Sequence, residues 1–142
     1  MKKEYADKWI AALRSGQYPK GRSALASRDN KDEPFSFCCL GVACEIFGKV
    51  RQETTFMRYY ETTTHKGGEC AILPHQLMLE MGMKRQTGIF PKELAAHIEI
   101  PLNEGGNRLI EEITSLTNLN DYVFLDSFEP IADFIEQNWE HL

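Results

Sequence analysis

The chain has 142 residues, of which 42% are apolar and 26% are charged, with 10 glycines and 6 prolines. This composition excludes collagen-like, mucin-like and wholly disordered proteins. The length predicts a single domain over residues 1–142 that buries a core without disulfide staples. No run approaches about 18 consecutive apolar residues and the first residues are charged, so we expect no membrane span, no secretory signal and a cytoplasmic protein.

The net charge of −5 is unevenly distributed. Residues 1–31 carry eight Lys or Arg against three acids, whereas residues 101–142 carry one against nine. A basic head and an acidic tail can pair within one chain, pair between the subunits of a homo-oligomer, or leave a basic patch for an anionic ligand. We favour pairing within the chain or plain solvation, because surface charges usually contribute little.

The first segment with helical periodicity is 5–15, whose apolar face comprises Trp9, Ile10 and Leu13. Gly16 follows it as the expected helix stop. Residues 17–34 are rich in Gly, Pro, Ser and charged side chains, which predicts an exposed loop. A loop of this length inside a small domain indicates either a functional or a mobile segment.

Residues 37–47 form the most apolar segment and predict a helix that is hydrophobic almost all round, as a buried central helix is. We expect Ser36 to cap its start and Gly48 to end it. Gly41 lies inside the segment, where a glycine costs about 1 kcal/mol relative to alanine. Its presence therefore predicts a close approach by another backbone or by a ligand.

The remaining segments predict one hairpin and several short helices. We expect strands at 54–64 and 70–73 joined by a turn at 66–68, and a further strand at 97–100. Helices are expected at 74–81, 91–96, 107–116 and from Ser127, with Pro130 in its first turn. The predicted fold class is α+β: a compact single domain with a buried central helix, flanking helices and a small antiparallel hairpin.

The four cysteines do not form a disulfide framework, because Cys38 and Cys39 are adjacent and Cys44 follows closely. We expect reduced thiols. On one helix these three side chains point in different directions, so we expect no metal site. No dinucleotide, phosphate-loop, zinc-protease or EF-hand motif occurs, and we expect no cofactor.

A cysteine hydrolase is the alternative enzymatic function. Cys38 or Cys39 would lie in the first helical turn, where the dipole and the free amides lower a thiol pKa, and His97 would act as the base. The position of His97 resembles that of the base in cysteine peptidases of the cell-wall amidase type, although those begin Cys-Ser-Gly. We favour the view that the cysteines are small core residues.

The basic first segment also suggests an anion site. The acidic remainder would repel a nucleic-acid backbone, so duplex nucleic acid is not expected, and a small nucleotide-like anion fits a local patch better. The candidate ligand-binding residues in this segment are Tyr18, Lys20, Gly21, Arg22 and Arg28.

Four stretches together resemble a family of small proteins of unknown function encoded by bacteriophages and some bacteria. They are residues 9–18 with Gly21 and Leu25, residues 37–44, residues 73–83 in part, and residues 116–121 with 127–136. The Cys-Cys-Leu-Gly-Val-Ala-Cys segment and the Leu119–Asn120–Asp121 turn are the most specific, so Asn120 and Asp121 join the candidate ligand-binding residues. The chain departs from the family at 31–33 and in a longer insertion between Asp121 and Ser127.

The resemblance implies a phage or prophage accessory protein acting in the host cytoplasm. Small phage accessory proteins are frequently inhibitors, and the same role is expected here by analogy with them. We therefore predict a non-enzymatic binding protein directed at a host protein or at an anionic nucleotide-like ligand. The alternatives are the cysteine hydrolase and an oligomeric scaffold whose basic and acidic ends meet between subunits.

Overall fold

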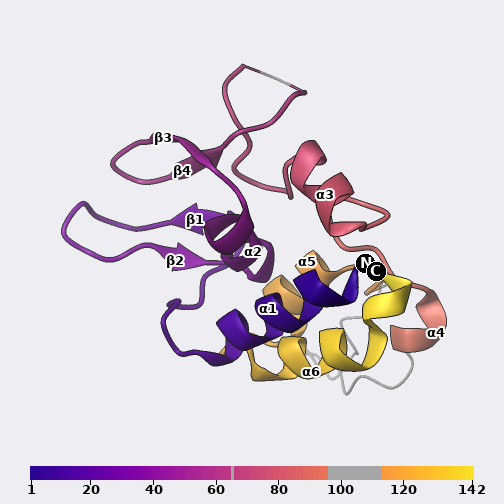
Figure 1. Cartoon of the computed structure of the whole chain (residues 1–142). Coiled ribbons are helices and arrows are strands. Elements are labelled where there is room, and N and C mark those ends of the chain that lie inside the picture. Colours follow the sequence, from indigo (N-terminus) through magenta and orange to yellow (C-terminus); the bar gives the residue numbers. More distant parts are fainter. Residues whose placement is uncertain (65, 96–112) are drawn as a thin grey trace.

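The computed structural model describes residues 1–64, 66–95 and 113–142. Within these residues, helices surround a central buried helix and two small antiparallel two-stranded ladders lie at one side (Figure 1). The predicted α+β class is confirmed. The predicted strand at 97–100, His97 and most of the predicted helix 107–116 lie outside the described residues. In the described part, no helix is both long and apolar enough to cross a membrane.

The elements follow one another as α1 (Lys3–Arg14), β1 (Ala26–Ser27), β2 (Ser36–Phe37), α2 (Cys39–Phe47), β3 (Val50–Glu53), β4 (Arg58–Tyr60), α3 (His75–Met81), α4 (Lys92–Ala95), α5 (Leu116–Asn118), the π-helical segment η1 (Leu119–Val123), α6 (Glu129–Asn138) and the 3-10 turn η2 (Trp139–His141). The predicted helices at 5–15 and 74–81 are confirmed to within two residues at both ends. The predicted helix at 91–96 is confirmed over Lys92–Ala95, and the C-terminal helix begins two residues after Ser127. Buried apolar residues from α1, α2, α3, α5 and α6 belong to one core cluster.

Helix α2 is the buried centre of the fold, as predicted, and its residues from Cys39 to Cys44 are all buried. The indole nitrogen of Trp9, on α1, donates a hydrogen bond of 3.0 Å to the carbonyl oxygen of Cys39. The predicted close approach at Gly41 is confirmed, because a Cβ there would lie 1.6 Å from the carbonyl oxygen of Leu25. Any side chain at Gly41 would therefore push the two backbones apart.

The start of α2 differs from the prediction. Ser36 does not cap the helix but belongs to β2, where it pairs with Ser27 while Phe37 pairs with Ala26. This antiparallel pairing keeps the chain extended up to Cys38, which is the N-cap residue. The sulfur of Cys38 accepts a hydrogen bond of 3.4 Å from the amide of Gly41.

The predicted hairpin of residues 54–64 with residues 70–73 is wrong in the strands that it pairs. In the structure β3 pairs with β4, residues 54–57 form the turn between them instead of a strand, and residues 70–73 form no strand. Thr54 determines this turn, because its hydroxyl donates to the carbonyl of Met57 and accepts from the amide of Met57, both at 3.1 Å. A second pairing does join Tyr60 to Glu69, as the predicted turn at 66–68 requires.

Residues 113–115, which the predicted helix 107–116 includes, are not helical. Ser115 is extended, with φ −147° and ψ 157°, and forms a bridge with Ile89. Its hydroxyl accepts a hydrogen bond of 3.2 Å from the amide of Asn118 and thereby caps the short helix α5. Helix α5 therefore begins at Leu116.

The basic and acidic ends of the chain meet where α1 packs against α6 (Figure 1). The guanidinium of Arg14 forms ion pairs with the carboxylates of Glu129, Asp133 and Glu136. At this contact the charges of the two ends pair within one chain, as the favoured interpretation of the charge pattern expected.

Candidate functional site

Asn120 joins three parts of the fold that are distant in sequence. Its side chain is fully buried, and its Oδ1 accepts hydrogen bonds from the amide of Cys39 at 3.0 Å and from the ammonium of Lys20 at 2.9 Å. Its Nδ2 donates to the carbonyl of Gly21 at 3.0 Å and to the Asp121 carboxylate at 2.8 Å. These four bonds use both donors and both acceptor sites of the amide. The hydrogen-bonding groups of the Asn120 side chain are therefore all used within the protein.

Lys20 is similarly engaged with the protein. Its ammonium also donates to the carbonyl oxygen of Asn120 at 3.2 Å and lies 5.1 Å from the centre of the Phe128 ring. Burial lowers the pKa of Lys20. The carboxylate of Asp121 accepts from the amide of Ser23 at 3.1 Å. The structure thus brings four candidate residues, Lys20, Gly21, Asn120 and Asp121, into one network, and their bonds are directed at one another.

The other three candidates in the basic segment lie apart from this network. Tyr18 packs edge-on against Phe37, with ring centres 5.6 Å apart. Arg22 is exposed and forms no ion pair within the described residues. Arg28 belongs to a different cluster, described below. Anion binding by this set of residues stays a prediction.

The cysteines of α2 are core residues. Cys38, Cys39 and Cys44 are buried, and the thiol of Cys39 donates to the carbonyl of Leu116 at 3.5 Å. Burial raises the pKa of Cys38 to about 11 and the pKa values of the other two well above the ordinary range. The expectation that the helix start lowers a thiol pKa is therefore wrong, because desolvation outweighs the dipole. In the described ranges, no three potential metal ligands gather in one place.

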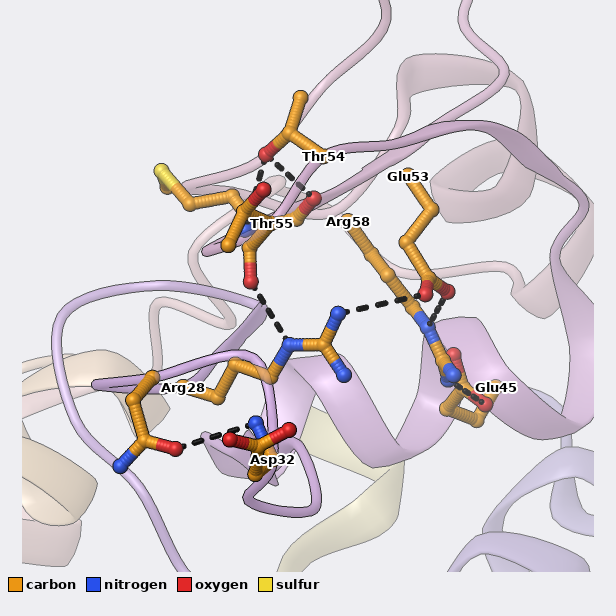
Figure 2. A network of polar contacts seen from close by, with 9 residues as sticks. Arg28, Asp32, Glu45, Glu53, Thr54, Thr55 and Arg58 are labelled. Atoms are coloured by element: carbon orange, nitrogen blue, oxygen red, sulfur yellow. Dashed lines mark hydrogen bonds and ion pairs between the residues drawn. The ribbon is translucent and has the colours of Figure 1, made fainter.

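A second polar network, which we call the hairpin cluster, links β1, α2, β3 and β4 (Figure 2). The guanidinium of Arg28 donates to the carbonyl of Thr55 at 2.7 Å and lies 3.8 Å from the carboxylate of Glu53. Arg58 bridges two acids, with its Nε 2.8 Å from Glu53 and its Nη1 2.9 Å from Glu45. The hairpin cluster comprises Arg28, Glu45, Glu53 and Arg58.

Aromatic contacts complete the hairpin cluster. The Phe35 ring lies against both guanidinium groups, 4.3 Å from Arg28 and 4.4 Å from Arg58. The hydroxyl of Tyr60 donates a hydrogen bond of 2.5 Å to Glu45, and burial together with this bond raises the pKa of Tyr60. Cation–π contacts and charge-assisted hydrogen bonds are among the stronger polar interactions in proteins. The cluster therefore restrains the strands that it connects.

The β1–β2 and β3–β4 loops project from the same side of the molecule (Figure 1). Arg28, Glu53 and Arg58 of the hairpin cluster lie where these loops meet their strands. We call residues 29–33 and 54–57 the hairpin tips. The amide of Arg28 donates to the carbonyl of Phe56 at 3.0 Å, and Ser27 bridges with Met57, so the two loops are joined. The side chain of Phe56 is 56% exposed at the end of its loop. The other loop exposes three acids and one lysine.

One of the two hairpin tips is predictable from the sequence, because residues 29–33 lie in the predicted exposed loop 17–34. The tip at 54–57 is not, because the sequence places Phe56 in a strand; the signal for it is the pair of threonines directly before this aromatic residue. An aromatic side chain in a tight turn has no sheet face against which to pack.

The family described as a domain of unknown function (DUF8296) matches residues 1–139, so the chain belongs to this family. No curated protein and no solved structure matches the chain. Membership of a family of unknown function is thus confirmed.

Proposed function

We propose that this chain is a non-enzymatic binding protein that holds another protein with its hairpin tips. The observation that carries the proposal is the exposed Phe56 at the end of a loop whose base is fixed by the hairpin cluster. A single aromatic side chain that enters a pocket of the partner typically supplies much of the binding free energy of an interface. Polar neighbours around it exclude water.

The hairpin cluster supports this proposal through preorganisation. A loop that is already ordered loses less conformational entropy when it binds than a loop that orders on contact. The carbonyl of Thr55 accepts from Arg28 and the carbonyl of Phe56 accepts from the Arg28 amide, so both loops are held in one arrangement.

The charges of the hairpin tips indicate the chemistry of the partner. The loop 29–33 exposes Asp29, Asp32 and Glu33 against Lys31, and therefore carries a net negative charge. The matching surface is an apolar pocket with a basic rim, because complementary charges steer association and favour the correct partner. On the family resemblance we take this partner to be a bacterial host protein, met in the cytoplasm and inhibited by a phage-type accessory protein.

Two observations count against the alternatives. Only a thiolate is a strong nucleophile, and the thiols of Cys38 and Cys39 are buried with raised pKa values, which disfavours the hydrolase. The ion pairs of Arg14 with α6 lie inside one chain, which leaves fewer free charges for a scaffold built on contacts between subunits.

The test is affinity purification from a bacterial lysate with quantitative mass spectrometry, comparing the wild type with Phe56→Ser and Tyr122→Ser. These two aromatic side chains are equally exposed, at 56% and 57%, so the second variant is a matched control. A purified partner is then titrated by calorimetry with each variant and with Asp32→Lys.

We expect one partner whose affinity falls at least about tenfold with Phe56→Ser, falls with Asp32→Lys and is unchanged with Tyr122→Ser. Retention of every captured protein by Phe56→Ser would refute the proposal. Equal losses with both aromatic variants would also refute it, because they would indicate nonspecific hydrophobic adsorption.

A further inference from the structure

A cleft of about 380 Å³ opens between the end of α2, β3, the chain after β4, and α3. Its volume lies at the small end of the range for ligand sites, roughly 300–1,000 Å³. None of its lining residues belongs to the hairpin tips or to the Asn120 network. A site here would therefore be separate from the protein-binding surface proposed above.

Charges of both signs line the cleft and do not pair. Lys49, Arg51 and Glu61 are exposed, and their side chains form no hydrogen bond or ion pair within residues 1–64, 66–95 and 113–142. Lys49 and Glu61 are neighbours across the ladder, joined by a backbone hydrogen bond of 2.8 Å, yet their charged ends stay apart. On α3, the carboxylate of Glu80 accepts a hydrogen bond of 3.2 Å from Gln76 and, in the part of the chain that the structure describes, forms no ion pair.

Cations and carboxylates that face one cleft without pairing leave both kinds of group available to a third molecule. A ligand with an anionic end can reach Lys49 and Arg51, and a hydrogen-bond-donating end can reach Glu61 or Glu80. A simple anion would meet repulsion from the two acids, and a simple cation would meet repulsion from the two basic residues. The charge pattern therefore favours a molecule that carries an anionic group at one end and hydrogen-bond donors at the other.

Apolar contact is available in the same cleft. Phe47 and Leu77 line it, and the Phe47 ring is held by the Tyr5 ring, whose centre lies 4.9 Å away. A ring fixed in this way offers a face on which a planar group can stack. A ligand site commonly combines such a surface with a few polar groups that set orientation.

We propose that this cleft binds a small organic anion of about mononucleotide size. Lys49 and Arg51 hold its phosphate or carboxylate, Phe47 contacts its planar body, and Glu61 with Glu80 accept hydrogen bonds from its amino or hydroxyl groups. AMP and L-tryptophan are suitable probes, because each combines a planar body, an anionic group and hydrogen-bond donors.

The test is calorimetric titration of the full chain with AMP, L-tryptophan, adenosine and inorganic phosphate. Saturable binding of AMP points to a phosphate ligand, and saturable binding of L-tryptophan points to a carboxylate ligand. Adenosine and inorganic phosphate, which each lack one part, should bind at least about tenfold more weakly than AMP. Absence of saturable binding by both AMP and L-tryptophan would overturn the proposal.

The double variant Lys49→Gln/Arg51→Gln should weaken binding of the active probe by about tenfold or more. The matched control is Lys84→Gln/Arg85→Gln, which likewise removes one lysine and one arginine charge, at exposed residues outside both the cleft and the hairpin tips. This control should leave the affinity within about twofold. Equal weakening by both double variants would mean that net charge alone attracts the probe, and would contradict a site in the cleft.

Glu61→Gln/Glu80→Gln separates the roles of the two signs. It should weaken the binding of AMP or L-tryptophan, whose donors then meet neutral amide oxygens in place of the more strongly accepting carboxylates, and strengthen the binding of inorganic phosphate, which no longer meets two repelling charges. Tighter binding of all the anionic probes would contradict the role of the two acids. The four substituted side chains are exposed, so their variants should fold.

Discussion

An increase from about pH 7 to about pH 10 should destabilise the protein through its three buried thiols. The ordinary pKa of these thiols is 9.0, and burial raises it to about 11 in Cys38 and well above 9.0 in Cys39 and Cys44. A thiol with a raised folded-state pKa holds its proton more tightly in the folded chain. Its contribution is therefore fully present below pH 9.0 and is lost as the pH rises towards the folded value.

The magnitude follows from the distance above the unfolded pKa. One pH unit above 9.0 costs about 1.4 kcal/mol for each thiol that stays protonated in the folded chain. The three thiols together cost about 4 kcal/mol at about pH 10. This is a large part of the roughly 5–15 kcal/mol by which folded domains are stable. Tyr60 contributes a smaller loss of stability at this pH than a thiol does, because its ordinary pKa is 10.0.

The assay is urea denaturation under reducing conditions at both pH values, for the wild type and for Cys44→Ala. The variant leaves a small cavity at every pH, but it should lose about a third less stability than the wild type on going to high pH. A wild-type loss below about 1 kcal/mol would refute the reasoning, as would an equal loss in both proteins. A reactive thiolate with a lowered pKa would give the opposite sign, with stability rising towards pH 9.0.

Two further predictions concern buried contacts. Asn120→Ala leaves the amide of Cys39 and the carbonyl of Gly21 without partners, and should cost about 3–5 kcal/mol in urea denaturation; a loss below about 1 kcal/mol would show that water replaces the side chain. Gly41→Ala should destabilise by about 3 kcal/mol or more, because its Cβ meets a carbonyl oxygen at 1.6 Å, although helix propensity alone favours alanine by about 1 kcal/mol. The exposed Ala11→Gly change measures that propensity alone, and a stabilised Gly41→Ala would contradict the close approach.

Features that depend on local sequence were predictable. The periodicity of α1 and the uniformly apolar α2 predict one amphipathic and one buried helix, and both occur. The glycine at position 41 predicts a close contact, because a helix interior tolerates glycine only at a cost. The partner in that contact, Leu25, was not predictable, since it comes from a loop that carries no periodic signal.

Features that depend on distant pairing were not predictable. The cap of α2 was misplaced because pairing with residues 26 and 27 keeps Ser36 and Phe37 extended. Lys20 and Asn120 were suspected separately, but their 100-residue separation conceals that they bond to each other. The hairpin cluster depends in the same way on the bridge between Ser27 and Met57, which brings Arg28 to the β3–β4 turn.

The hydrogen bond from the Cys39 amide to Asn120 also bears on how the chain folds during synthesis. Its acceptor, Asn120, lies 81 residues after its donor. Helix α2 therefore leaves the ribosome long before Asn120, which binds its first turn, has been synthesised. The helix is apolar almost all round, and α5, which packs against it in the finished fold, has not yet been made either. Because synthesis proceeds at about 5–20 residues per second, this exposed interval lasts for seconds. We expect the nascent chain to need a chaperone until residue 120 emerges, and its folding to be completed only after that point.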